Sequence, residues 1–305
     1  MRAPGLSWAQ GSVSKVNTED KVVTIADKIS GKEYDESYDY LVIATGLRRQ
    51  WPAVPQSLTR KAYLAETGKH IEEVKAAKEG VVVIGGGVAG CSTAYHLAKF
   101  GWKDVILLER DRLTSGTTWH AAGLIGQLGA SAAITKLRKY SLDLYKKLEQ
   151  ETELSTGLKQ NGAVTVASTE SRLEELKRQA TTAQLFNVEA NILTPKEVKN
   201  LYPLVSTNDV IGGVHMPLDG QADPVGVTNV LAKAARMNGA TIIEKCPVKK
   251  ILIKNNKITG VETDQGNIEC EIIVLATGMW SRQLAAEVNV SVPLYPDEHF
   301  YILTE

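Results

Sequence analysis

The chain has 305 residues and balanced charge, with 35 lysine and arginine residues against 35 aspartate and glutamate residues. This balance argues against a surface that binds nucleic acid or an anionic membrane, because both normally need a basic excess. No apolar run approaches the roughly 20 residues that span a bilayer. The three scattered cysteines show neither metal-ligand spacing nor a disulfide framework, which favours a reducing compartment.

The first 80 residues predict a run of short strands, a linker and a helix. Apolar and β-rich stretches separated by a glycine turn indicate a β-meander, and prolines then interrupt any regular element. In chain order, the expected segments are a meander over 11–46 with strands at Val22–Ile25 and Tyr40–Ala44 and a turn near Gly31, a linker at 47–60, and a helix at Glu66–Ala77.

Residues 81–108 predict a strand–helix–strand unit. Val81–Ile84 is a short apolar run typical of a buried parallel strand. A helix follows the next glycines and extends to about Phe100, where Gly101 is a stop signal. Asp104–Leu108 is the second strand, so the arrangement is a βαβ unit.

The rest of the chain alternates helices with strands. Two amphipathic helices are expected at 131–153 and 170–186. Two more start at Thr194-Pro195 and Asp223-Pro224, where a capping residue precedes proline. Strands joined by tight turns follow over residues 248–276. This order predicts an α/β protein with a second, mixed domain.

The glycine-rich turn after the first buried strand matches the dinucleotide-binding pattern G-x-G-x-x-G. Gly85 permits the tight turn, Gly87 lets the backbone approach a pyrophosphate, and Gly90 lets helix and strand pack closely. Val88 and Ala89 then present helix N-terminal amides to the phosphates. Because strand, loop and helix are in register, we predict a dinucleotide-binding site.

An acidic residue follows at the distance that such a site needs. Glu109 lies 19 residues after Gly90, at the end of the second predicted strand. Its carboxylate can accept hydrogen bonds from both ribose hydroxyls, and its charge repels a 2′-phosphate, so NADP is disfavoured. These residues do not distinguish FAD from NAD.

The segment Arg110–Gln127, with the sequence RDRLTSGTTWHAAGLIGQ, is placed to run beside the pyrophosphate and on towards a flavin ring. Its hydroxyl side chains can bond phosphate oxygens, and Gly116 permits close approach. With this segment included, residues 81–305 resemble the dimethylglycine/sarcosine dehydrogenase branch of the D-amino-acid-oxidase-like FAD proteins. The resemblance lies in VVVIGGGVAG, TSGTTWHAAGL, GAVTVAS, DGQADP at 219–224 and ATGMW at 276–280.

The resemblance implies an α/β fold over residues 80–305, with a Rossmann-like FAD-binding domain and a mixed α+β antiparallel-sheet substrate domain. This domain is expected to be C-terminally truncated, because further strands would cover the flavin ring. The resemblance also implies that His120 carries FAD covalently through the 8α position, whereas a lone histidine would be interpreted as partly buried and hydrogen-bonded. The predicted cofactor-binding residues are Gly85, Gly87, Val88, Ala89, Gly90, Glu109, Arg110, Ser115, Gly116, Thr117, Thr118, Trp119, His120, Ala121, Ala122, Gly123, Leu124, Val248 and Trp280.

Further residues are implied on the adenine and substrate sides. Val248 would present backbone groups to the adenine, and Trp280 would pack near the cofactor; as alternatives, both are ordinary core residues. His299 and Tyr301 are the implied catalytic residues, with the tyrosine hydroxyl orienting an amine or carboxylate. The alternative is a β-strand with alternating aromatic residues.

The implied function is the oxidation of an N-methylated amino acid of the dimethylglycine or sarcosine type. A hydride would leave the N-methyl carbon for flavin N5, giving an iminium that hydrolyses to formaldehyde. The implied partners are a small-molecule amine and an electron acceptor, either electron-transfer flavoprotein or oxygen. The implied compartment is the mitochondrial matrix if the family is followed, and the cytoplasm otherwise.

The N-terminal residues resemble a different family. Residues 34–84 are similar to the middle of the AIF-like NAD(P)H:quinone oxidoreductases, so 1–79 is expected to be a partial pyridine-nucleotide-disulfide-oxidoreductase-like segment, joined to the rest at the shared VVVIGGG. Two alternative functions follow. One is an NAD(P)H-dependent flavin reductase without covalent flavin, and the other is a truncated FAD-binding protein without turnover.

Overall fold

The computed structural model describes residues 11–27, 30–39, 61–62, 64–65, 68, 80–300 and 302. The chain divides into two compact units, Met1–Leu58 and Thr59–Glu305. Four sequence predictions lie outside the described residues: the strand at Tyr40–Ala44, the linker at 47–60, most of the helix at Glu66–Ala77, and Tyr301.

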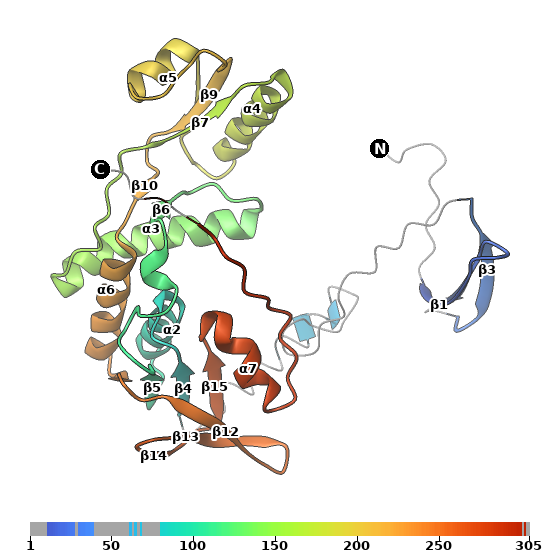
Figure 1. Ribbon diagram of the computed structural model, residues 1–305, viewed down its shortest axis with the longest axis vertical. Coiled ribbons are helices and arrows are strands. Elements are labelled where there is room, and N and C mark those ends of the chain that lie inside the picture. The colour runs from blue at the N-terminus through green and yellow to red at the C-terminus, as the bar shows by residue number, and fades with distance from the viewer. Residues whose placement is uncertain are drawn as a thin grey trace. The chain divides into compact units, whose positions relative to one another are not determined.

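In the first unit, three strands form an antiparallel meander in the order β1-β2-β3 (Figure 1). Val23 on the middle strand is buried, whereas every residue of the third strand is exposed. The predicted meander, including its turn at Gly31, is confirmed for the described residues. The strands are β1 (Gly11–Asn17), β2 (Val22–Asp27) and β3 (Glu33–Ser37).

The second unit is built on a parallel sheet of four strands in the order β11-β5-β4-β15 (Figure 1). All four residues of β4 are buried, as expected for an apolar run covered on both faces. The predicted βαβ unit is confirmed, because β4 pairs in parallel with β5. The strands are β4 (Val81–Ile84), β5 (Val105–Leu108), β11 (Thr241–Ile243) and β15 (Ile272–Leu275).

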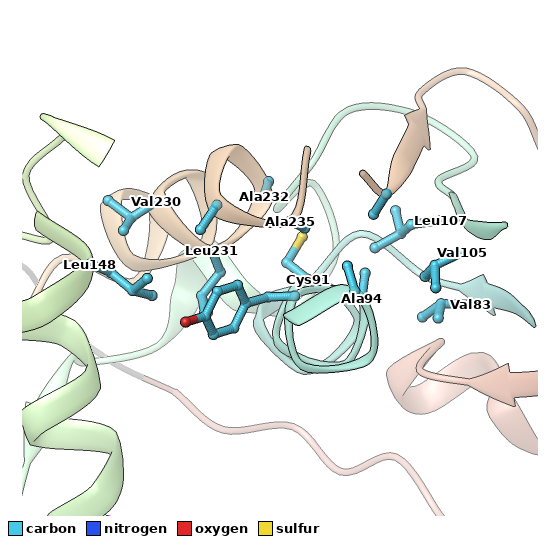
Figure 2. Close-up of a cluster of buried hydrophobic side chains, with 14 of the residues drawn as sticks. Val83, Cys91, Ala94, Val105, Leu107, Leu148, Val230, Leu231, Ala232 and Ala235 are labelled. Atoms are coloured by element: carbon cyan, nitrogen blue, oxygen red, sulfur yellow. The ribbon is translucent and has the colours of Figure 1, made fainter. Parts of the chain in front are cut away.

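Alternate residues of β4 pack into different layers. Val83 joins a cluster with Cys91 and Ala94 of α2 and Leu231 of α6, which Figure 2 shows between the helices and the sheet. Val82 packs on the opposite face, against an antiparallel meander of three strands. Burial of a side chain such as Leu231 contributes about 1.5–3 kcal/mol. The elements are α2 (Val88–Lys99), α3 (Ala132–Thr152) and α6 (Pro224–Met237) on one face, and β12 (Val248–Lys254), β13 (Lys257–Thr263) and β14 (Gly266–Glu269) on the other.

A smaller antiparallel sheet forms the second domain of this unit (Figure 1). Its strands run in the order β7-β9-β8, and α4 packs on it through Leu176 and Ala180. The short helix α5 begins with the predicted capping box of Thr194 and Glu197. The mixed antiparallel-sheet domain is therefore confirmed. Its elements are β7 (Ala163–Ala167), α4 (Glu170–Gln184), β8 (Asn191–Leu193), α5 (Pro195–Leu201) and β9 (Gly212–Met216).

The three cysteines are small buried residues, as expected for apolar packing. Burial raises the pKa of Cys91 to about 12 and that of Cys270 to about 11. These two thiols are therefore protonated near neutral pH and are poor nucleophiles. Within the described residues, no helix combines the length and apolarity that crossing a membrane requires.

The interpretation of the segment around His299 as a β-strand is wrong for its described residues, 297–300 and 302, and the other residues of that segment lie outside the described part of the chain. Residues 291–300 form no strand, and they pair with none of the described strands. A strand needs a partner for its backbone hydrogen bonds, so alternating aromatic residues alone do not produce one.

Candidate functional site

A cavity of about 560 Å³ lies at the carboxyl ends of three strands of the parallel sheet. The last residues of β4, β5 and β15, which are Ile84, Leu108 and Leu275, all line it. Parallel α/β sheets bind ligands at this edge, and the volume is in the range of small-molecule sites. The cavity is therefore the strongest candidate site among the described residues.

The glycine-rich turn forms one wall of this cavity because it packs against β15. Gly85 has φ +114°, and a Cβ there would collide with the carbonyl oxygen of Ala276. A Cβ on Gly90 would collide with the Gly85 carbonyl oxygen. The turn and the close helix–strand packing predicted for these two glycines are confirmed.

The N-terminus of α2 faces the cavity, and its N-cap residue Gly87 has no side chain to cap it, while the Thr118 hydroxyl accepts one N–H, that of Val88. By contrast, the N-cap residues of α3, α4, α5 and α6 each accept a helix N–H with their own side chain, and those caps are Ser131, Thr169, Thr194 and Asp223. The first turn of α2 also holds no acidic residue. Because a helix N-terminus carries partial positive charge and unpaired N–H groups, this end suits an anionic ligand.

Glu109 stands beside this helix end and is only 8% exposed. One carboxylate oxygen accepts the Gly86 N–H at 2.6 Å, and the other accepts the Asp111 N–H at 3.0 Å. Each oxygen keeps a further lone pair for a hydroxyl donor. The predicted position of Glu109 at the end of the second strand is confirmed, its side chain lines the cavity, and its bond to a ribose stays a prediction.

A tryptophan and an arginine form another part of the cavity wall. The Arg110 guanidinium lies 4.0 Å from the centre of the Trp280 ring, which is a cation–π contact. A Cβ on Gly116 would make an ordinary 3.5 Å contact with the same indole. Trp280 is half-buried and lines the cavity together with Val248.

The segment after Glu109 divides into a lining part and an exposed part. Gly116, Thr117 and Thr118 line the cavity, and the Thr118 hydroxyl accepts the Val88 N–H at 3.1 Å. The exposed part surrounds a 3₁₀ turn, η1 (Thr118–His120), where His120 is exposed and not partly buried. The predicted residues that do not line the cavity are Gly90, Ser115, Trp119, His120, Ala121, Ala122, Gly123 and Leu124.

A second motif holds the exposed part in place, and the sequence did not predict this role. The strand β6 (Leu124–Ile125) pairs with β10 (Gly220–Gln221), which belongs to the segment DGQADP. The Ala222 N–H donates to the Gly123 carbonyl at 2.8 Å. Gly123 has φ +71°, and a Cβ there would collide with the Ala222 carbonyl oxygen.

The two aspartates of DGQADP complete this support. Asp219 is 5% exposed and accepts the Gln127 N–H at 2.9 Å. Asp223 accepts two N–H groups of the first turn of α6. The motif therefore holds the chain that follows η1, from Gly123 to Gln127, and in this way it supports the site.

The two predicted catalytic residues are not brought to the cavity within the described residues. His299 is exposed and does not line it, and Tyr301 lies outside the described residues. Their catalytic role stays a prediction.

Two families match the chain. The FAD dependent oxidoreductase family matches residues 80–305, and the pyridine nucleotide-disulphide oxidoreductase family matches residues 2–128. The two matches overlap at the glycine-rich turn, where the sequence resemblance also changes.

Similar proteins come from both curated sequences and solved structures. Mitochondrial sarcosine dehydrogenase of Homo sapiens is 43% identical over 231 residues, which are 74% of this chain and 25% of that protein. The mitochondrial pyruvate dehydrogenase phosphatase regulatory subunit of Mus musculus is 41% identical over 73% of this chain and 26% of that protein. The structure of L-proline dehydrogenase from P.horikoshii has a TM-score of 0.65 and 34% identity, covering 70% of this chain and 56% of that chain. The chain thus spans about a quarter of the length of these curated relatives.

Proposed function

The chain belongs to the FAD dependent oxidoreductase family, and from this premise we propose that it holds FAD in the cavity and oxidises a small amine that carries a carboxylate. One observation carries the proposal. The glycine-capped N-terminus of α2 and the buried carboxylate of Glu109 meet at the same cavity, at the carboxyl edge of a parallel sheet.

The residues present fit the adenylate and pyrophosphate parts of FAD. The pyrophosphate would take the amides at the start of α2, where Gly87 has no side chain to block its approach. The ribose hydroxyls would donate to Glu109, and the adenine would lie against Val248. The flavin end would extend past Thr118 towards His120.

The substrate class follows from what the similar proteins share. Sarcosine and L-proline, the substrates that two of their names give, are both α-amino acids with a secondary amine nitrogen. We therefore assign this chain to secondary or N-methylated amino acids. Bound FAD would accept a hydride from the carbon beside the amine nitrogen, and an electron acceptor, electron-transfer flavoprotein or oxygen, would then reoxidise it.

We further propose that His120 carries the flavin covalently. The exposure of His120 leaves its imidazole accessible to a ligand that extends beyond Thr118. The hydrogen bond between Thr118 and the start of α2 links η1 to the phosphate end of the cavity. A residue two positions further along that turn is thus close to the path that the rest of FAD would follow.

The test of function is flavin reduction by an amine. The full chain, loaded with FAD, is mixed with sarcosine or L-proline without oxygen, and the visible absorption of oxidised flavin is followed. We expect the amine to bleach this absorption and oxygen to restore it. An amine without the carboxylate, such as dimethylamine, is the matched control and should bleach the flavin far more slowly.

Other outcomes would contradict the proposal. Bleaching by NADH and by no amine would support the alternative function of an NAD(P)H-dependent flavin reductase, which the match of residues 2–128 favours. Bound flavin that neither amines nor NADH reduce would indicate a protein without turnover. The similarity to a phosphatase regulatory subunit favours that second result.

The contact between Arg110 and Trp280 gives a separate prediction about cofactor affinity. We expect Arg110→Ala to weaken FAD binding about threefold, because Arg110 is exposed and its cation–π contact, which holds Trp280 in the cavity wall, contributes roughly 0.5–1 kcal/mol. Affinity is measured by flavin fluorescence in a chain that also carries His120→Ala, so that FAD exchanges freely. Arg112→Ala is the matched control, since Arg112 is exposed and does not line the cavity. Equal effects of the two substitutions would contradict a specific role of Arg110.

A further inference from the structure

Trp119 stacks on the histidine that is proposed to carry the flavin. The centres of the Trp119 and His120 rings are 3.6 Å apart, and the ring planes are tilted by 32°. Such a short separation between adjacent residues means that the indole covers one face of the imidazole. The side-chain orientation of His120 is therefore restricted by its neighbour.

Trp119 has no evident part in the core. Its side chain is 52% exposed, and it belongs to none of the buried clusters of the described residues. A large aromatic side chain usually gains more stability from burial than this position provides. The stack on His120 is thus an aromatic contact that this exposed indole makes outside the core.

The backbone around the two rings is held from both sides. The Thr118 hydroxyl accepts the Val88 N–H, and the His120 N–H donates to the Thr117 carbonyl at 3.3 Å. The Ala121 N–H donates to the Thr118 carbonyl at 3.1 Å. With the backbone fixed, the main remaining freedom of His120 is rotation of its side chain, which the indole limits.

We propose that Trp119 is a positioning residue for covalent flavin attachment, an inference that rests on the proposed tether at His120. The indole holds the imidazole in the orientation from which a ring nitrogen bonds to the flavin. It also stabilises the positive charge that the imidazole carries when that bond forms, since the face of an indole attracts cations.

Covalent attachment forms one bond and breaks two. A bond forms between a ring nitrogen of His120 and the carbon of the flavin's 8α-methyl group, and a C–H bond of that methyl group breaks. The two electrons of the C–H bond reduce the isoalloxazine ring, and two protons are released, one from the methyl group and one from the imidazole N–H. Dioxygen then takes the two electrons and two protons and becomes hydrogen peroxide.

The test measures the rate of attachment in the full chain. FAD is added in air to chain that has been prepared without flavin, and the covalent product is followed as flavin fluorescence that remains with the denatured protein on a gel. Trp119→Leu removes the aromatic face at similar size, and Trp119→Phe keeps it. We expect Trp119→Leu to slow attachment at least about tenfold and Trp119→Phe to stay within about threefold of the native rate.

A second measurement separates positioning of His120 from direct contact with FAD. In the His120→Ala background, Trp119→Leu should leave the affinity for FAD unchanged within about twofold. Attachment at the native rate in Trp119→Leu would overturn the inference, and so would an equal loss of affinity and rate. If the native chain binds FAD but forms no covalent product, the proposed bond between His120 and the flavin is ruled out, and with it the role of Trp119.

Discussion

Replacing His120 with alanine is expected to move the flavin from the precipitated protein to the supernatant. If the imidazole forms the tether, acid denaturation of the native chain leaves the flavin in the pellet, because a covalent bond survives unfolding. In His120→Ala, the hydrogen bonds and packing that hold FAD are lost on unfolding, so essentially all flavin is released. The measurement is the flavin absorption of pellet and supernatant after acid precipitation.

The matched control is His299→Ala, which removes another exposed histidine of the same unit. It should leave the flavin in the pellet as in the native chain. Flavin that leaves the native pellet entirely would show that FAD is bound without a tether. Release in both variants would mean that histidine loss acts through folding and not through the bond.

The parts of this fold that the sequence predicted are those fixed by neighbouring residues. The buried run Val81–Ile84 became a parallel strand, because four consecutive apolar residues require cover on both faces. The helix starts at Thr194 and Asp223 were predicted because a capping side chain acts within its own first turn. The glycine turn was predicted for the same reason, since its geometry depends on a few adjacent residues.

The parts that the sequence did not predict depend on contacts between distant residues. Asp219 supports the chain near Gln127 across 92 positions, and no local pattern reports such a contact. The stack of Arg110 on Trp280 joins two loops at the ends of different strands. For the described residues 297–300, the strand interpretation is wrong for the opposite reason, because local alternation was present and no described strand pairs with them. The sequence therefore predicted the glycine turn and Glu109 of the candidate site. It did not predict the contacts that hold the exposed loop after η1.

Gly87→Ala is expected to weaken FAD binding about 100-fold while the fold persists. Gly87 has φ −81° and ψ −178°, which any residue adopts, so alanine causes no backbone strain. A Cβ there would lie 2.7 Å from the Thr118 hydroxyl oxygen, which accepts the Val88 N–H. Thr118 must therefore shift, and the methyl group then stands where the pyrophosphate would approach the helix amides. Loss of several such hydrogen bonds to an anion is worth about 3 kcal/mol.

The affinity of Gly87→Ala is measured by flavin fluorescence in the His120→Ala background, so that a tether cannot hide a weak site. Gly116→Ala is the matched control, because it makes the same substitution in the same cavity and its Cβ meets only an ordinary 3.5 Å contact with Trp280. We expect Gly116→Ala to change the affinity by less than about threefold. Thermal unfolding without FAD should be similar in both variants, since neither position needs a positive φ. If Gly87→Ala bound FAD as tightly as Gly116→Ala, the phosphates would not lie at the start of α2. The helix amides would then not explain how the cavity binds the phosphates of FAD, and the assignment of FAD would rest on the cavity and Glu109 alone.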